Sequence, residues 1–253
     1  MWSYLPALGL PLLGAAVVVA LWWLATIVFG IQPFVLPAPP DIAKAFTRLP
    51  GYLLRQTQTT LMETLAGFGL AVLGGLLMAM VLTAFRVIER AIFPLLVAAN
   101  AVPKIAVAPL LVVWLGFGSV PKIVMVFLIS FFPIVVAAGA GLTSMPAELG
   151  ELARSLSASR RQMFVKLRIP WALPQIFIGL KVGITLAVVG AVVGEFSGGD
   201  QGLGYVILGS GASADTPLAF AAMTLLGAMS VALFYLVAGV EWLLLPWARE
   251  ISG

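Results

Sequence analysis

The chain has 253 residues, of which 62% are hydrophobic and only 9% are charged. About a quarter of the residues of a water-soluble domain are usually charged, so the composition excludes a soluble globular protein and predicts one membrane-embedded domain over residues 1–253. The sequence has no cysteine and no histidine, which excludes disulfides, thiol and imidazole catalysis and the usual zinc sites. The net charge is +4, and the basic residues form no stripe that would bind nucleic acid.

Six apolar segments are long enough to cross a bilayer, because a hydrocarbon core of about 30 Å needs about 20 helical residues. They are Leu8–Gly30, Leu65–Phe85, Ala91–Leu115, Ile123–Thr143, Trp171–Gly194 and Pro217–Val240. Each is expected to be helical, because unpaired backbone groups are costly in lipid. The third segment contains Pro94, Pro103 and Pro109, so we expect it to be kinked or broken. The fold class is therefore an all-α polytopic membrane protein.

The segment between the first two spans is polar. The prolines of Leu36-Pro37-Ala38-Pro39-Pro40 enforce extended backbone. Asp41 is then expected to cap a short helix, Ile42–Leu49. The stretch Arg55–Glu63 is polar but compatible with a helix. We expect it to lie at the membrane surface ahead of the second span.

Basic residues in the loops predict the orientation, because cytoplasmic loops carry more lysine and arginine than outer loops. With the N-terminus inside, the cytoplasmic side receives eight bases: Arg86, Arg90, Arg154, Arg160, Arg161, Lys166, Arg168 and Arg249. The outer side receives four: Lys44, Arg48, Arg55 and Lys122. We therefore place both termini in the cytoplasm.

Glycines recur at four-residue spacing in the fifth span. Gly179 and Gly183 form one such pair, and Gly190 and Gly194 form another. Small residues at this spacing let two membrane helices approach closely and gain dispersion contacts. The pairs are typical of packing within one chain, but a seam between two copies would need the same spacing.

The long basic cytoplasmic loop, residues 144–170, carries the most specific pattern. Ser144 is expected to cap a first helix with Pro146 in its first turn. The helix then has one narrow apolar stripe, formed by Leu149, Leu152, Ala153 and Leu156. A turn around Ser157 leads to a second short helix, Arg160–Arg168. The residues alone leave two interpretations open: docking on lipid headgroups or docking on a soluble protein partner.

Polar groups inside the spans are candidates for a translocation pathway. Lys104, beside Pro103, is a functional candidate because intramembrane charges are costly; it could attract an anionic substrate, face a water-filled vestibule or pair with Glu195. Glu195 could belong to an outer gate, receive a binding protein or be a charge at a helix end. Asn100 and Thr185 could line the cavity or hydrogen-bond between helices. Lys181 is expected to snorkel toward the cytoplasm.

The stretch Glu151–Pro170 resembles the signature loop of permease subunits of bacterial ABC importers, which reads Glu-Ala-Ala, three residues, Gly, nine residues, then Ile-x-Leu-Pro. Glu151, Ala153 and Pro170 match this pattern, and Leu167 and Ile169 are conservative at its aliphatic positions. Leu152 replaces the middle alanine and Ser157 replaces the glycine, and serine tolerates a positive φ less well than glycine.

The resemblance covers nearly the whole chain. Leu36-Pro37 before Asp41, the run Ala101–Gly118, Phe131-Phe-Pro133, Val192–Phe196 and Gly202–Tyr205 are all similar to segments of the same family. They point to its branch of sulfonate, taurine, nitrate, riboflavin and thiamin-precursor permeases. Val192–Phe196 and Ala101–Gly118 are most similar to the permeases for the thiamin pyrimidine precursor and riboflavin.

The resemblance implies a type I ABC importer permease in the bacterial inner membrane. It implies a homodimer, a dimer of ATP-binding subunits that hold ATP and magnesium, and an extracytoplasmic solute-binding protein. Its coupling residues would be Glu151, Leu152, Ala153, Leu156, Ser157, Leu167 and Pro170. Movement of this loop would switch the cavity between the two sides of the membrane, which is a population shift.

This chain has no Gly-x-x-x-x-Gly-Lys-Ser/Thr phosphate-binding loop, so we expect it to be a transport subunit rather than an enzyme and to bind no cofactor or metal. A channel or gradient-driven carrier would have the same hydropathy but would not need the cytoplasmic loop. A membrane-embedded enzyme would lack ordinary catalytic groups, because no histidine, cysteine or intramembrane aspartate is present.

Overall fold

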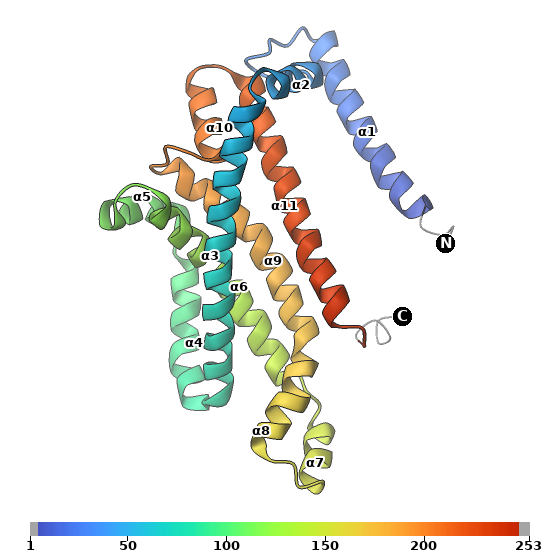
Figure 1. Ribbon diagram of the computed structural model, residues 1–253, viewed down its shortest axis with the longest axis vertical. Helices are drawn as coiled ribbons and strands as arrows, with labels where there is room; N and C mark the ends of the chain where they lie inside the picture. The colour runs from blue at the N-terminus through green and yellow to red at the C-terminus, as the bar shows by residue number, and fades with distance from the viewer. Residues whose placement is uncertain (1–4, 248–253) are drawn as a thin grey trace.

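The structure is a computed structural model that describes residues 5–247, and all the regular structure in this range is helical. Figure 1 shows an elongated helical bundle in which α2 and α10 lie at one end and α7 and α8 at the other. The helices are α1 (Leu5–Val28), α2 (Pro39–Arg48), α3 (Pro50–Ala84), α4 (Arg86–Ala101), α5 (Lys104–Leu115), α6 (Ser119–Thr143), α7 (Ala147–Ser155), α8 (Arg160–Met163), the π-helix η1 (Phe164–Arg168), α9 (Ile169–Phe196), α10 (Leu203–Ala212) and α11 (Thr216–Leu244).

Four helices in the described range are each long and apolar enough to cross a membrane: α3, α6, the α8–η1–α9 rod and α11. The pair α4 and α5 together passes the same test, and α1 contains a shorter apolar stretch, Leu13–Val28. The predicted all-α membrane protein is confirmed. The bases assigned to the inner side place the end that carries α7 and α8 in the cytoplasm, and the end that carries α2 and α10 outside.

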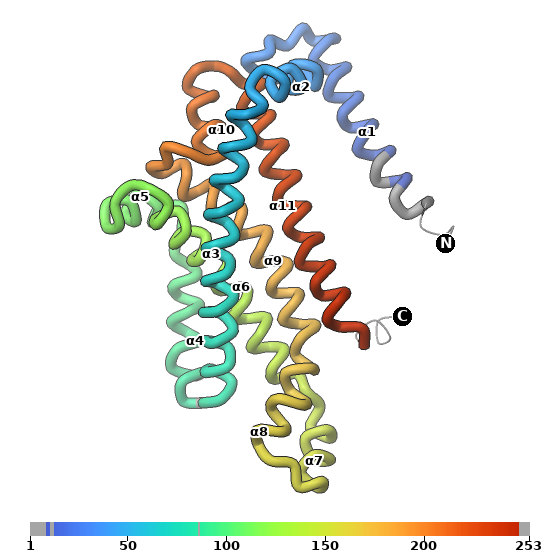
Figure 2. The backbone as a smooth tube through the Cα atoms, viewed as in Figure 1, coloured from blue at the N-terminus to red at the C-terminus, as the bar shows by residue number. Residues whose placement is uncertain are grey.

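The third predicted span is broken rather than straight. Helix α4 ends at Ala101 and α5 begins at Lys104, and their axes differ by 92°. Val102 is extended and precedes Pro103, which cannot donate a backbone hydrogen bond. Figure 2 shows the chain turning sideways at this point before it enters α6. The prediction of a kinked or broken third span is confirmed, and the break lies at Pro103.

Two predictions for the outer segment are wrong. The stretch Arg55–Glu63 does not lie flat at the membrane surface, because α3 continues without interruption over 35 residues from Pro50. One face of the stretch instead turns inward, where Gln56, Thr60 and Glu63 are buried, while Arg55 and Gln58 stay exposed. Asp41 lies inside the first turn of α2 rather than at its N-cap, which is Ala38.

The glycine pairs of α9 pack within the chain, against α6. A Cβ atom on Gly190 would lie 2.8 Å from Val126 Cα, and one on Gly194 would lie 2.9 Å from Lys122 Cα. The alternative of a seam between copies is therefore not needed for these residues. Because backbones in contact leave no room for a methyl group, the seam between α6 and α9 fixes the relative height of Lys122 and α9.

Candidate functional site

The cytoplasmic loop folds into two short helices joined by a tight turn. Helix α7 is followed by a turn in which Ser157 has a φ of 59°. This is the position at which the signature pattern has glycine, so the substitution places a serine in a left-handed conformation that disfavours side chains. The predicted conflict at Ser157 is therefore present in the backbone.

The second short helix begins with a reciprocal cap. Ser159 Oγ accepts a hydrogen bond from the Gln162 N–H, and Gln162 Oε1 accepts one from the Ser159 N–H. The helix passes through η1 directly into α9, so the predicted helix Arg160–Arg168 is the cytoplasmic extension of a span. The predicted cap at Ser144 is wrong: Ser144 ends α6, and α7 begins after Pro146.

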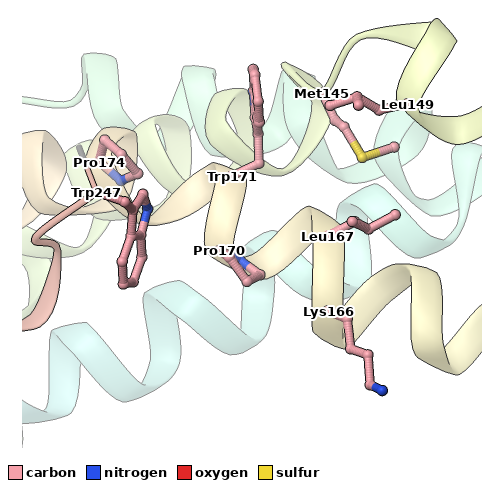
Figure 3. A pocket seen from close by; sticks show the side chains of 8 residues that line it. All are labelled: Met145, Leu149, Lys166, Leu167, Pro170, Trp171, Pro174 and Trp247. Atoms are coloured by element: carbon pink, nitrogen blue, oxygen red, sulfur yellow. The ribbon is translucent and has the colours of Figure 1, made fainter. Parts of the chain in front are cut away.

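Two adjoining apolar pockets lie between α7 and the start of the α8–η1–α9 rod. The first, of about 400 Å³, is shown in Figure 3, where Leu167, Pro170 and Trp171 lie along the rod and Met145 and Leu149 lie on the α7 side. The second, of about 350 Å³, is lined by α7 and α8 residues that include Leu152, Ala153, Leu156 and Leu167. Most of the predicted coupling residues thus line one apolar surface.

The predicted coupling residues differ in exposure. Leu156 and Leu152 are 75% and 58% exposed, whereas Ala153 is buried against the rest of the loop. Glu151 and Ser157 are also exposed. Large apolar side chains exposed beyond the spans, beside a basic helix, are typical of a docking surface for another protein.

At the break between α4 and α5, the structure brings together three of the predicted pathway residues. Lys104 Nζ donates hydrogen bonds to Asn100 Oδ1 at 2.6 Å and to the Asn100 carbonyl oxygen at 3.2 Å. Pro103 lies between them and is the N-cap of α5. The amino group of Lys104, at the start of α5, is therefore held by Asn100 near the end of α4 rather than by Glu195. Thr185 lies apart from them, and its hydroxyl donates to Val182 within α9.

Glu195 lies in a buried cluster at the outer end of the bundle, which we call the outer polar cluster: Gln56, Thr60, Glu63, Lys122 and Glu195. Lys122 Nζ and Glu63 Oε1 form an ion pair at 3.0 Å, with both side chains 3% exposed. Thr60 Oγ1 donates to Glu195 Oε1 at 2.7 Å. Lys122, which we assigned to the outer side, lies in the first turn of α6 at that end, but its side chain is buried rather than free in a loop.

Lys181 also has a partner within the bundle. Its amino group lies 2.8 Å from Glu241 Oε2 of α11, and both side chains are about a quarter exposed. Glu241 lies in the last turn of α11, so the ion pair crosslinks α9 to the end of α11. A partner of opposite charge lowers the cost of placing Lys181 in an apolar span.

Three residues of the outer polar cluster were missed by sequence reasoning: Gln56, Thr60 and Glu63. A signal was present, because positions 56, 60, 63 and 64 follow helical spacing and continue on the same face into the small residues Gly67 and Ala71 of the second span. All these positions are buried. The polar stripe was therefore the outward continuation of a packing face.

Comparison with known proteins agrees with this geometry. Residues 71–248 match the family model described as "Binding-protein-dependent transport system inner membrane component". The riboflavin transport system permease protein RibX of Chloroflexus aurantiacus is 37% identical over 96% of this chain and 91% of its own length. The formylaminopyrimidine transport permease protein ThiX of Halalkalibacterium halodurans is 33% identical over 95% of this chain and 96% of its own.

A solved structure shares the fold. A chain of the methionine ABC transporter MetNI, in an inward-facing conformation, superposes with a TM-score of 0.68. The match covers 77% of this chain and 96% of that one at 19% sequence identity. This likeness shows the fold, which is that of a type I ABC importer permease.

Proposed function

Because the chain belongs to the family of binding-protein-dependent transport system inner membrane components, we propose that it is the permease subunit of an ATP-driven importer that moves a small solute into the cytoplasm by alternating access. The observation that carries the proposal is the cytoplasmic loop. Its exposed Leu152 and Leu156 and the pockets beside them are a docking surface outside the membrane bundle.

The partner on this surface is a dimer of ATP-binding subunits, which hold ATP and magnesium. The rod from α8 through α9 supports this role, since a push on Arg160–Arg168 is transmitted along one continuous helix to Glu195. Two copies of this chain form the permease in the bacterial inner membrane, and a solute-binding protein delivers substrate to the outer end. A channel or gradient-driven carrier is not favoured, because neither needs such a cytoplasmic surface.

The substrate is a small aromatic heterocycle, such as a flavin or a pyrimidine. The relatives named for riboflavin and formylaminopyrimidine support this class, at 37% and 33% identity. The relatives named for aliphatic sulfonates and taurine are 30% and 26% identical, so a sulfonate, taurine or nitrate-type anion is the second substrate class. Purified binding protein, tested by thermal shift against both classes, distinguishes them.

The docking surface is tested by the double variant Glu151→Ala, Leu152→Arg. A charge placed where an apolar anchor docks costs about 2 kcal/mol or more at an interface, so co-purification with the ATPase and ATP-driven uptake are expected to be lost. The matched control is Glu89→Ala, Val87→Arg on α4, which likewise removes a glutamate and replaces an exposed aliphatic side chain by arginine. Intact ATPase association in the first variant would show that the loop is not the docking surface.

Lys104 is tested separately as a pathway residue. Its amino group and Asn100 lie at the broken span, where irregular backbone in a membrane usually lines a cavity. Lys104→Met is expected to lower the uptake rate or change the range of substrates taken up while leaving ATPase association intact. An unchanged rate and range would remove Lys104 from the pathway, and Thr185→Ala tests the candidate on α9 in the same way.

A further inference from the structure

The short helix α10 and the turn before it are tied to α3 by buried hydrogen bonds. The Gly202 N–H donates to Gln56 Oε1 at 2.5 Å, and the Leu203 N–H donates to Thr60 Oγ1 at 2.8 Å. These are N-terminal N–H groups of α10, which have no acceptor within the helix itself. Side chains of α3 therefore cap the N-terminus of α10 by accepting hydrogen bonds from its free N–H groups.

Glu195 joins the same connection from α9. Its Oε2 accepts a hydrogen bond from the Gly204 N–H at 2.5 Å, and its Oε1 accepts one from Thr60. The residue is 1% exposed, so it faces neither water nor a pathway in this conformation. Both carboxylate oxygens are used for holding protein groups rather than for receiving a solute.

The ion pair of Lys122 and Glu63 reaches the same turn. Besides Glu63, Lys122 Nζ donates to the Gln201 carbonyl oxygen at 3.1 Å. Glu63 lies about one helical turn beyond Thr60 on α3, so the two groups of contacts form one continuous cluster. The outer polar cluster thus binds the turn 201–204 to α3, α6 and α9 at once.

The glycines of the turn are required by this arrangement. Gly202 has a φ of 113°, and a Cβ atom there would collide with the Glu195 carboxylate. A Cβ atom on Gly204 would lie 2.8 Å from Glu195 Oε2. The backbone approaches the Glu195 carboxylate closely because no side chain separates them. Glycine at positions 202 and 204 is therefore what allows Glu195 to hold this turn.

We propose that Glu195 is a positioning residue that holds α10 rigidly at the outer end of the permease, where the binding protein docks. Through Glu195, docking on α10 is transmitted to α9 and along α9 to the cytoplasmic loop. This inference rests on the proposed function. The apolar contacts of Leu203 and Val206 with α2 and α11 help to hold α10, but apolar burial is non-directional. The hydrogen bonds of the cluster fix where the helix begins.

The absence of cysteine from the chain allows a direct test by single-cysteine labelling of the reconstituted protein. Val206→Cys places a thiol on the buried face of α10, where the native side chain is 2% exposed. In the Glu195→Ala background we expect a maleimide reagent to label this thiol about ten-fold faster or more, because lost charge-assisted hydrogen bonds shift local opening by that order. Ser213→Cys, at the exposed end of α10, is expected to label equally in both backgrounds.

Two further variants separate positioning from general damage. Gly202→Ala is expected to act like Glu195→Ala, whereas Gly209→Ala, whose Cβ meets nothing within 4 Å, is expected to label like wild type. Glu195→Gln is expected to restore slow labelling, since its amide oxygen can accept from Gly204 and the Thr60 hydroxyl can turn to the Gln56 carbonyl oxygen, 3.2 Å away. Equal labelling of Val206→Cys in wild type and Glu195→Ala would overturn the positioning role.

The functional arm measures ATP hydrolysis by the complete complex in lipid, with and without its purified binding protein. Glu195→Ala and Gly202→Ala are expected to keep basal hydrolysis and to lose stimulation by the binding protein about ten-fold or more. If Glu195→Ala speeds the labelling of Val206→Cys but keeps full stimulation of ATP hydrolysis by the binding protein, α10 is held by the cluster but does not transmit docking. A wild-type chain that binds no ATPase would refute the proposed function. Maleimide labelling of Val206→Cys needs no partner and would still decide whether Glu195 positions α10.

Discussion

Lys122→Met should be among the most destabilising single substitutions in the chain. Lys122 and Glu63 are each 3% exposed and lie 3.0 Å apart. At an effective dielectric constant of about 20, two unit charges at this separation attract each other by about 5 kcal/mol. Removing one partner of a buried pair leaves the other charge unpaired and costs about 3–5 kcal/mol. We expect a loss of that size in the free energy of unfolding.

The double variant Lys122→Met, Glu63→Gln should recover much of this loss, because a neutral pair of similar volume leaves no buried charge. The assay is unfolding of the purified chain by SDS in mixed micelles, followed by circular dichroism, for the wild type, both single variants and the double variant. The four stabilities give a coupling energy of about 2–3 kcal/mol. Lys44→Met is the matched control, since Lys44 is 78% exposed and its pair with Asp41 contributes at most about 1 kcal/mol.

Equal unfolding free energies of Lys122→Met and Lys44→Met would show that the buried pair does not stabilise the fold. A double variant that lost the sum of the two single losses would show that Lys122 and Glu63 contribute independently. The hydrogen bond from Lys122 to the Gln201 carbonyl oxygen is lost whenever Lys122 is replaced, with or without Glu63, so it cancels from the coupling energy.

Three further outcomes follow from the backbone and the membrane interior. Ser157→Gly should stabilise the cytoplasmic loop by up to about 1 kcal/mol, because glycine adopts the positive φ at this position without strain. We expect slower proteolysis of the loop, and faster cleavage would contradict the prediction. Gly190→Ala should destabilise the chain by about 1–3 kcal/mol through collision with α6, whereas Gly227→Ala, with open space around its Cβ, should not; equal SDS unfolding midpoints would disprove the tight seam. Lys181→Met should lower stability by about 1 kcal/mol or more by breaking the partly buried pair with Glu241, and an unchanged midpoint would show that the pair contributes nothing.

The cytoplasmic loop shows how far local sequence information reaches. The apolar stripe of α7, the turn at Ser157 and the second helix were all predicted, because each depends on residues close together in the chain. The helix ends were less well predicted: Ser144 can hydrogen-bond equally at the end of one helix or the start of the next. The structure resolves this in favour of α6, whose Gly141 carbonyl oxygen accepts the Ser144 hydroxyl.

The same contrast holds in the spans. The break at Pro103 was predictable, since a proline removes a helical hydrogen bond wherever it is placed. The 92° angle between α4 and α5 was not, because it depends on how α5 packs against α6. The choice between packing within the chain and between copies at Gly190 and Gly194 was likewise decided only when α9 was placed beside α6.

The sequence by itself determined that this protein is an all-helical membrane protein and that its basic loop carries a narrow apolar stripe. These properties depend on hydropathy, charge and helical periodicity, which neighbouring residues carry. Only the tertiary structure decided that Glu63 pairs with Lys122 and that Thr60 holds Glu195, across 59 and 135 residues of chain. A buried charge in lipid requires a partner, but its identity depends on the relative height and rotation of α3, α6 and α9, which close packing at their small residues sets.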